Sequence, residues 1–270
     1  MPVYTVLGGT GATDGAVIKA LANSSSTKNN ITTRVYVRSK NRLHQKLPFI
    51  ANHPSTTVIE GSLDDNFTLA SCLRDADVIF SCIATNSSEP GTNIALSTAA
   101  AIIFTLQQLR STLGNAYKAP TVLVLTSMSV NTALKGHPAR PIQAIIHTAL
   151  HYLYEDLHRA QQLYCELEHR DPGLLKVIFI QPPAILPAEK ATGYRLSTTE
   201  GGGAVSFADL GYAMVEVAER KEDFAGKGVT VVSTGFVAQN WRGNAKALAI
   251  GLFAYFFPTV WGMGRGLSWW

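Results

Sequence analysis

The sequence lacks clustered charge, paired cysteines and a leader-like start, and each absence excludes a class of protein. Its 23 Lys and Arg residues are scattered, so a net charge of +4 does not indicate a nucleic-acid-binding surface. Cys72, Cys82 and Cys165 are too few and too far apart for a disulfide framework or a zinc site, which suits a reducing, cytoplasmic compartment. No charged segment followed by an apolar one opens the chain, so we expect no secretory signal.

The most informative residues are the first fifteen. The apolar run Val3–Leu7 predicts a buried strand, which breaks into glycines that include Gly8 and Gly11. A helix-like stretch at 16–21 follows. A strand that turns through glycines into a helix is the dinucleotide-binding arrangement, because backbone N–H groups and the positive helix end attract a pyrophosphate. The sequence therefore predicts a nucleotide-binding fold.

One position departs from that fingerprint. Counting on from Gly8 and Gly11 in steps of three, the third glycine should stand where the chain has Asp14, and Gly15 follows one place later. A carboxylate beside a phosphate is repulsive. If the site is intact, we expect Asp14 to turn away from the phosphates and to cap the helix that begins near Gly15.

Strands and helices alternate along most of the remaining chain. Further strands are expected at 33–38, 56–60, 77–84, 121–127 and 175–180, with helices at 94–113 and around 154–169. The apolar residues of 77–84 are nearly continuous, as in a strand covered on both faces. The pattern predicts an α/β fold with a doubly wound, mostly parallel sheet. We divide the chain into a nucleotide-binding domain at 1–235, with substrate-side segments at about 183–210, and an apolar helix and tail at 236–270.

Several segments resemble one known family. They are Gly8–Gly11, Val37–Ser39, Gly61–Asp65, Asp77–Ser81, Leu125–Ser127, Gln181–Ile185 and Val205–Gly211. The chain resembles atypical short-chain dehydrogenases/reductases of the NmrA-like group, in particular flavin/biliverdin reductase B-type proteins and fungal secondary-metabolism oxidoreductases. The likeness covers most of the chain and implies a Rossmann fold that binds NADP(H).

The resemblance also implies which residues hold the cofactor. These are Gly8, Thr10, Gly11, Ala12, Thr13, Arg38, Ser39, Leu63, Asp64, Ala84, Thr85, Pro182, Pro183 and Ala184. The second strand ends in Arg38 with further basic residues and no acid nearby, and an arginine there accommodates the 2′-phosphate of NADP. The alternative is an ordinary solvated basic turn.

The catalytic residues of classical short-chain dehydrogenases/reductases are matched only in part, and atypical members often lack them. Ser127 stands where the classical members carry a serine, and Tyr154 stands where they carry the tyrosine of a Tyr-x-x-x-Lys pair. His158 follows in place of the lysine. Lysine lowers the tyrosine pKa for proton transfer, and we expect His158 to serve as a cationic partner or as the proton donor itself. The alternative is an exposed helix histidine and a packing tyrosine.

If this segment is one helix, it carries a row of polar rings on one face: His147, His151, Tyr154 and His158. Two histidines four apart can chelate a metal, but no carboxylate or thiolate completes a site, so we expect no metal. Lining of the substrate site and ordinary packing remain the other interpretations.

The C-terminal stretch 245–257 is strongly apolar but shorter than the roughly 20 residues of a membrane span, so we expect none. Three interpretations of this stretch remain: it packs across the substrate site, it forms a homodimer interface, or it touches a membrane surface. An aromatic wall there would suit a flat, hydrophobic substrate.

We expect an NADP-dependent oxidoreductase that acts on an aromatic or polyketide-like small molecule. The alternatives are a non-redox isomerase, dehydratase or cyclase, and a dinucleotide-sensing regulator.

Overall fold

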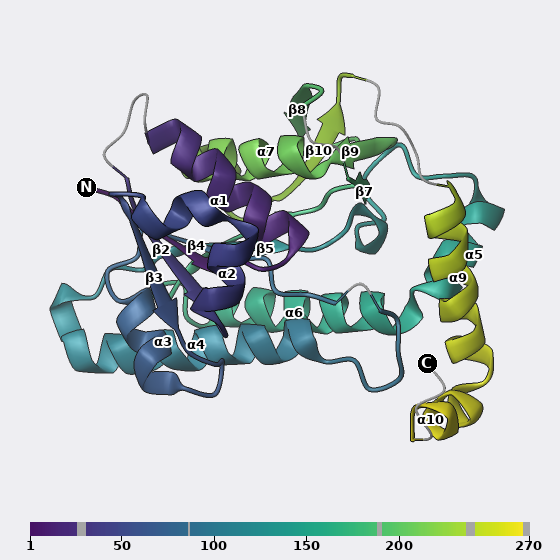
Figure 1. The fold of residues 1–270 in the computed structure, drawn as a ribbon, viewed down its shortest axis with the longest axis horizontal. Coiled ribbons are helices and arrows are strands. Elements are labelled where there is room, and N and C mark those ends of the chain that lie inside the picture. The colour runs from purple at the N-terminus through teal and green to yellow at the C-terminus, as the bar shows by residue number, and fades with distance from the viewer. Residues whose placement is uncertain (26–30, 86, 188–190, 236–240, 267–270) are drawn as a thin grey trace.

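A computed structural model describes residues 1–25, 31–85, 87–187, 191–235 and 241–266. Its centre is an eight-stranded sheet in the order β3-β2-β1-β4-β5-β6-β10-β8 (Figure 1). The strands are β1 (Val3–Leu7), β2 (Thr32–Val37), β3 (Thr56–Glu60), β4 (Val78–Ser81), β5 (Thr121–Leu125), β6 (Lys176–Ile180), β8 (Tyr194–Ser197) and β10 (Gly228–Ser233). Only β8 is antiparallel to its neighbour, β10. Two short strands, β7 (Ala184–Leu186) and β9 (Ala204–Ser206), pair separately.

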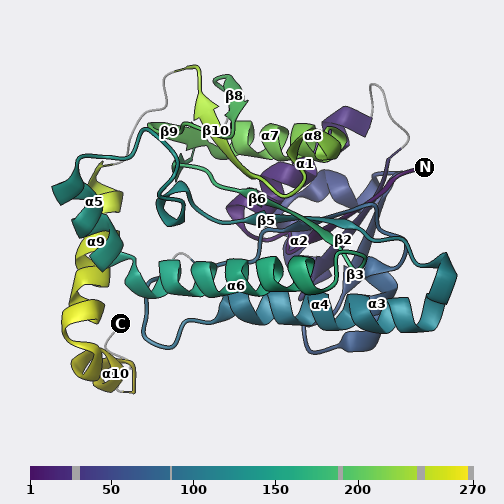
Figure 2. The same cartoon turned by 180° about the vertical axis from the view of Figure 1, so that it is seen from behind.

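Helices cover both faces of the sheet. The helices are α1 (Ala12–Ser25), α2 (Lys40–Lys46), α3 (Asn66–Leu73), α4 (Ile94–Leu113), α5 (Arg140–Ala149), α6 (His151–Arg170), α7 (Phe207–Glu219), α8 (Lys221–Phe224), α9 (Trp241–Phe256) and α10 (Pro258–Gly266). Of these, α5, α9 and α10 lie beyond the sheet rather than on its faces (Figures 1 and 2). Short 3-10 turns add η1 (Pro48–Asn52), η2 (Gly114–Ala116) and η3 (Met128–Val130). In both views α1 and α7 lie on one face, while α4 and α6 lie on the other (Figures 1 and 2).

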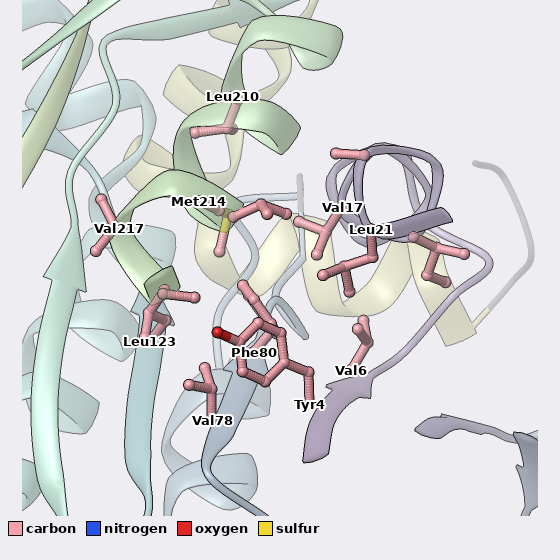
Figure 3. Close-up of a cluster of buried hydrophobic side chains, with 14 of the residues drawn as sticks. Tyr4, Val6, Val17, Leu21, Val78, Phe80, Leu123, Leu210, Met214 and Val217 are labelled. Carbon is pink, nitrogen blue, oxygen red and sulfur yellow. The ribbon is translucent and has the colours of Figure 1, made fainter. Parts of the chain in front are cut away.

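The core follows from the two-residue period of the strands. Val6 and Phe80 face α1 and α7, as Figure 3 shows, whereas the adjacent Leu7 and Ile79 belong to the cluster beneath α4 and α6. All four side chains are fully buried. Strands covered on both faces must be apolar at successive positions, which explains the unbroken apolar runs in the sequence.

Helices α1 and α7 pack unusually closely above the sheet. A Cβ at Gly211 would lie 2.6 Å from the backbone of Ala16, so glycine is required there for the two helices to approach. At the start of α7, the Ser206 hydroxyl accepts a hydrogen bond from the Asp209 N–H at 2.9 Å and caps the helix. The Asp209 carboxylate in turn accepts hydrogen bonds from Thr192 and Gly193.

The sheet order confirms the predicted doubly wound fold. The chain reverses its winding direction between β1 and β4, and ligands of such folds bind outside the carboxyl ends of the strands at this switch point. The predicted nucleotide, serine and proline segments all follow carboxyl ends of parallel strands. The expected division between 235 and 236 adjoins residues 236–240, which lie outside the described residues, and it stays a prediction.

Candidate active site

The glycine loop joins β1 to α1 as the sequence predicts. Gly8 has φ +95°, a conformation that favours glycine, and its N–H donates to the Tyr36 carbonyl at 2.9 Å. Gly11 and Ala12 are exposed at the point where α1 begins. The first N–H groups of a helix lack partners within it and attract an anionic group such as a diphosphate, although two N–H groups of this turn already donate to the Asp14 carboxylate.

Asp14 lies inside this loop rather than on its exposed side. Its side chain is buried, and its carboxylate accepts hydrogen bonds from the Gly11 N–H at 3.1 Å and the Gly15 N–H at 3.0 Å. A Cβ at Gly8 or Gly11 would come within 2.6 Å of a carboxylate oxygen, so both glycines leave room for this side chain. Burial raises the pKa of Asp14, while these backbone N–H groups lower it by a smaller amount.

The end of β2 differs from expectation in one respect. Arg38 is exposed and Ser39 caps α2, its hydroxyl accepting from the Arg42 N–H at 3.3 Å. However, Glu60 at the end of β3 accepts a hydrogen bond from the Lys40 N–H at 2.7 Å. No acid lies near Arg38 in the sequence, but parallel pairing of β2 and β3 brings Glu60, 20 positions beyond Lys40, to the same edge.

The other expected cofactor residues follow the strands β1, β3, β4 and β6. Ala84, Asp64 and Ala184 are exposed, Thr10, Leu63 and Thr85 are half-buried, and Thr13, Pro182 and Pro183 are buried. The Thr85 hydroxyl accepts from the Ser87 N–H at 3.0 Å, and the Thr10 carbonyl accepts from the Lys46 ammonium group. Their positions at one edge of the sheet fit an extended dinucleotide, and their individual contacts with it stay predictions.

Tyr154 meets the loop that follows β5. Its hydroxyl donates to the Ser129 Oγ at 3.1 Å, and the Ser127 Oγ accepts from the Ser129 N–H at 3.2 Å. Burial raises the pKa of Tyr154, an effect that hydrogen bonds with Ser129 and Ser127 partly offset. The tyrosine is consequently a neutral phenol at physiological pH, able to donate a proton.

His158 does not join this group. It is exposed, and its Nε2 lies 3.1 Å from the Gln162 Nε2 on the same helix. Helix α6 buries Leu157 and Ala160 instead, and this rotation turns His158 toward solvent. The side chain at the position that carries lysine in classical short-chain dehydrogenases/reductases therefore does not reach Tyr154 in this structure.

A different histidine contacts the tyrosine. The rings of His147 and Tyr154 meet edge to face with centroids 5.3 Å apart. The buried Nε2 of His147 has no hydrogen-bond partner among the described residues. Burial lowers the pKa of His147, and the nearby His137 lowers it further, so the imidazole is neutral at physiological pH.

The row of polar rings expected on one helix is broken. The helix ends at Ala149, Leu150 has φ −104° and ψ 21°, and α6 starts afresh at His151. His151 points elsewhere, with its Nε2 3.4 Å from the Glu155 carboxylate. Within the described part of the chain, no group of three or more His, Cys, Asp or Glu side chains could hold a metal ion.

Two polar contacts that the sequence did not suggest fix the position of this group. The buried Asp156 accepts hydrogen bonds from the Ala95 and Leu96 N–H groups at 2.8 and 3.0 Å, which ties α6 to the start of α4. The Asn131 Nδ2 donates to the Gln181 Oε1 at 2.8 Å and joins the loops after β5 and β6. Both link residues at least 50 positions apart, so no local pattern announces them.

Comparisons with known proteins agree with this geometry. A sequence family described as NAD(P)H-binding matches residues 8–221. Averufin oxidase A of Dothistroma septosporum is 35% identical, covering 100% of this chain and 94% of that protein. Oxidoreductase AgnL4 of Paecilomyces divaricatus is 31% identical and covers 96% of both chains. A short-chain dehydrogenase/reductase of Veillonella parvula, solved with NADP, shares the fold at TM-score 0.64 and 17% identity, covering 87% of this chain and 95% of its own. The chain is an oxidoreductase and belongs to the NAD(P)H-binding family.

Proposed function

We propose that this oxidoreductase uses NADP(H) on a hydrophobic, aromatic or polyketide-like small molecule. The observation that carries the proposal is the Tyr154–Ser129 hydrogen bond at the carboxyl edge of the sheet, the edge that also bears the glycine loop. The substrate class is supported by similarity to a protein named averufin oxidase. When bound, the nicotinamide supplies a hydride acceptor or donor.

The protein supplies the proton. When the substrate is reduced, the neutral Tyr154 hydroxyl can donate its proton to the substrate oxygen that gains negative charge. When the substrate is oxidised, Tyr154 can accept a proton from a substrate hydroxyl after its own proton has passed to another group. Ser127 and Ser129 hold this hydroxyl in place through their hydrogen bonds. Proton transfer by a positioned side chain contributes typically about 10²–10⁴-fold to the rate.

His147 replaces the missing lysine in this proposal. A lysine beside the tyrosine would favour the phenolate by its charge. A neutral imidazole acts differently, because it can take up or release the proton that Tyr154 exchanges with substrate. The His147 ring contacts the Tyr154 ring and its Nε2 has no partner among the described residues, so exchange with the Tyr154 hydroxyl would pass through an intervening water or substrate group.

Preference for NADP over NAD is also a proposal. Arg38 is exposed and free to meet a 2′-phosphate, whereas the nearby Glu60 would repel it. The Glu60 carboxylate already accepts a hydrogen bond from the Lys40 N–H, which reduces its repulsion of a 2′-phosphate.

We place the protein in the cytoplasm because its three cysteines are unpaired, as in a reducing compartment.

The test is turnover of an aromatic polyketide substrate followed at 340 nm together with product. We expect one nicotinamide oxidised or reduced per product, and Tyr154→Phe and His147→Ala variants that bind NADPH normally but turn over at least about tenfold more slowly. Tyr152→Phe is the matched control, because Tyr152 lies in the same helix turn and contacts His151 instead. Product formation by cofactor-free protein would contradict the proposal and favour isomerase or cyclase chemistry.

A further inference from the structure

The last two helices form an apolar segment with little to cover it. Helices α9 and α10, which we call the C-terminal arm, lie beyond the end of α6 and apart from the central sheet (Figures 1 and 2). Helix α9 packs on α5, where Gly251 lies too close to the Ala149 carbonyl for any side chain. Exposed apolar side chains of the arm include Ile250, Phe256, Phe257, Val260 and Met263.

This exposure is unusual for such a composition. Between residues 245 and 257 the sequence has one charged residue, Lys246, so α9 has no broad polar face to present to water. Helices that are apolar on most sides are normally buried, and large exposed apolar patches mark interaction sites. Phe256 and Met263 are nevertheless each 63% exposed. The arm therefore requires a partner.

The charge and aromatic content of the arm indicate which partner. No Asp or Glu occurs from residue 224 to the end of the chain, while Arg242, Lys246 and Arg265 lie within the arm. All four tryptophans of the chain lie between residues 241 and 270. Trp261 is buried within the arm, but exposed phenylalanines with basic residues and no acids are typical of segments that lie at the surface of an anionic bilayer.

A second copy of the chain fits this composition less well. A two-fold interface brings the same surface of each copy together. Pairing of two arms would place basic segments against each other with no acid in either arm to balance them. Anionic lipid headgroups supply the opposite charge that the arm lacks.

We propose that the C-terminal arm docks the protein on the surface of a membrane that contains anionic lipid. Phe256, Phe257 and Met263 would enter the region between headgroups and acyl chains, with the exposed Lys246 near the phosphates. Among the described residues, no single helix is long and apolar enough to cross a bilayer. Parts of α9 and α10 pass that test only together, and they are bent by 109° at their junction, which suits a segment lying along a surface.

The docking also bears on substrate access. Helix α5 contacts the arm at Ala149 and contacts Tyr154 through His147. A docked arm would therefore hold the candidate active site close to the bilayer in which a hydrophobic substrate dissolves. This consequence rests on the proposed function, whereas the docking itself does not.

The experiment is binding of the intact protein to vesicles of phosphatidylcholine alone and of an equal mixture with phosphatidylserine. Because every tryptophan lies in or just after the arm, a blue shift of tryptophan emission reports on this segment. We expect the shift and co-sedimentation with mixed vesicles, at least about tenfold tighter than with phosphatidylcholine and weaker in high salt. A Phe256→Ser/Phe257→Ser double variant should lose about tenfold or more in binding.

Two further variants keep the test decisive. Phe67→Ser is the matched control, since Phe67 is 87% exposed but lies on α3, and it should bind like the unmutated protein. Lys246→Glu changes an exposed side chain and should weaken binding to mixed vesicles several-fold even if the double variant fails to fold. Equal binding of folded double variant and unmutated protein would overturn the proposal. The proposal would also be overturned if the unmutated protein bound no vesicles and formed a dimer that the double variant does not form. Neither readout involves turnover, so the outcome is independent of the proposed function.

Discussion

Replacing Asp14 by glycine tests whether the carboxylate inside the loop opposes cofactor binding. The carboxylate is held by the Gly11 and Gly15 N–H groups, directly beneath the turn that we expect to bind the diphosphate. Two unit charges about 8 Å apart repel by about 2 kcal/mol at an effective dielectric constant of about 20. Removing this charge should therefore lower the Kd for NADPH by up to about 30-fold.

The same change costs stability. Two backbone N–H groups lose their acceptor, at about 1 kcal/mol each, and glycine in a helix costs about 1 kcal/mol more than alanine. The variant should consequently bind NADPH as well as or better than the unmutated protein while unfolding at a lower urea concentration. Isothermal titration at low and moderate salt measures the first effect, and urea unfolding followed by circular dichroism measures the second.

The pH dependence gives an independent readout of the same carboxylate. Burial raises the pKa of Asp14 above the ordinary value of 3.8, so the folded protein binds its proton more tightly than the unfolded chain does. Its contribution to stability is thus fully present below pH 3.8 and is lost as pH rises through the raised pKa. NADPH affinity of the unmutated protein should rise as pH falls through that window, and the glycine variant should lack this dependence.

Asp75→Gly is the matched control, because Asp75 is exposed at the amino end of β4, the opposite edge of the sheet, and has φ +57°. Glycine relieves that conformation, so the control should be at least as stable as the unmutated protein and bind NADPH unchanged. A folded Asp14→Gly variant that no longer binds NADPH would refute the reasoning. It would show that the carboxylate shapes the binding loop rather than opposing the ligand.

Two further pairs of substitutions test cofactor preference and helix packing. Arg38→Ala should weaken NADPH binding about tenfold or more relative to NADH, and Glu60→Gln should shift the ratio the other way, as titration of both nucleotides will show. Equal affinity of the unmutated protein for both nucleotides would contradict the assignment of Arg38. Gly211→Ala should lower the free energy of unfolding by about 1–3 kcal/mol because the new methyl overlaps the Ala16 backbone. Gly173→Ala, where nothing lies within 4 Å of the added carbon, should leave urea unfolding nearly unchanged.

The parts of the fold that are set by local pattern were predictable. The apolar run 121–127 predicts β5, and the long helix at 94–113 matches α4 residue for residue. The periodicity of apolar residues and the flanking residues are sufficient to predict these two elements, because the faces that each element buries are set by its own sequence. The edge strand β8 and its neighbour β10 were missed, since the antiparallel pairing of Thr230 with Ser197 depends on segments far apart in the chain.

Only those parts of the candidate site that follow from the family resemblance or from a single strand were predictable. Ser127 and Tyr154 are brought to one place, but the partner of Tyr154 was misassigned because nothing in the sequence marks the break at Leu150. Neither glycine nor proline stands there, and a continuous helix would have placed His147 and His158 on one face. The break turns His147 onto the tyrosine ring while His158 faces solvent.

This placement of His147 has a chemical consequence for the proposed reaction of this chain. A lysine one turn after the tyrosine favours the phenolate at any physiological pH, whereas a neutral histidine can both accept and return a proton. Burial and His137 lower the pKa of His147, so its charged form appears only toward acidic pH. In the direction that oxidises the substrate, we therefore expect the rate to fall as pH drops through the lowered pKa of His147, where the imidazole can no longer accept a proton from Tyr154. The His147→Ala variant should be slower throughout and should lack this acidic limb, whereas Tyr152→Phe should retain it. An unchanged acidic limb in the His147 variant would assign proton exchange to another group.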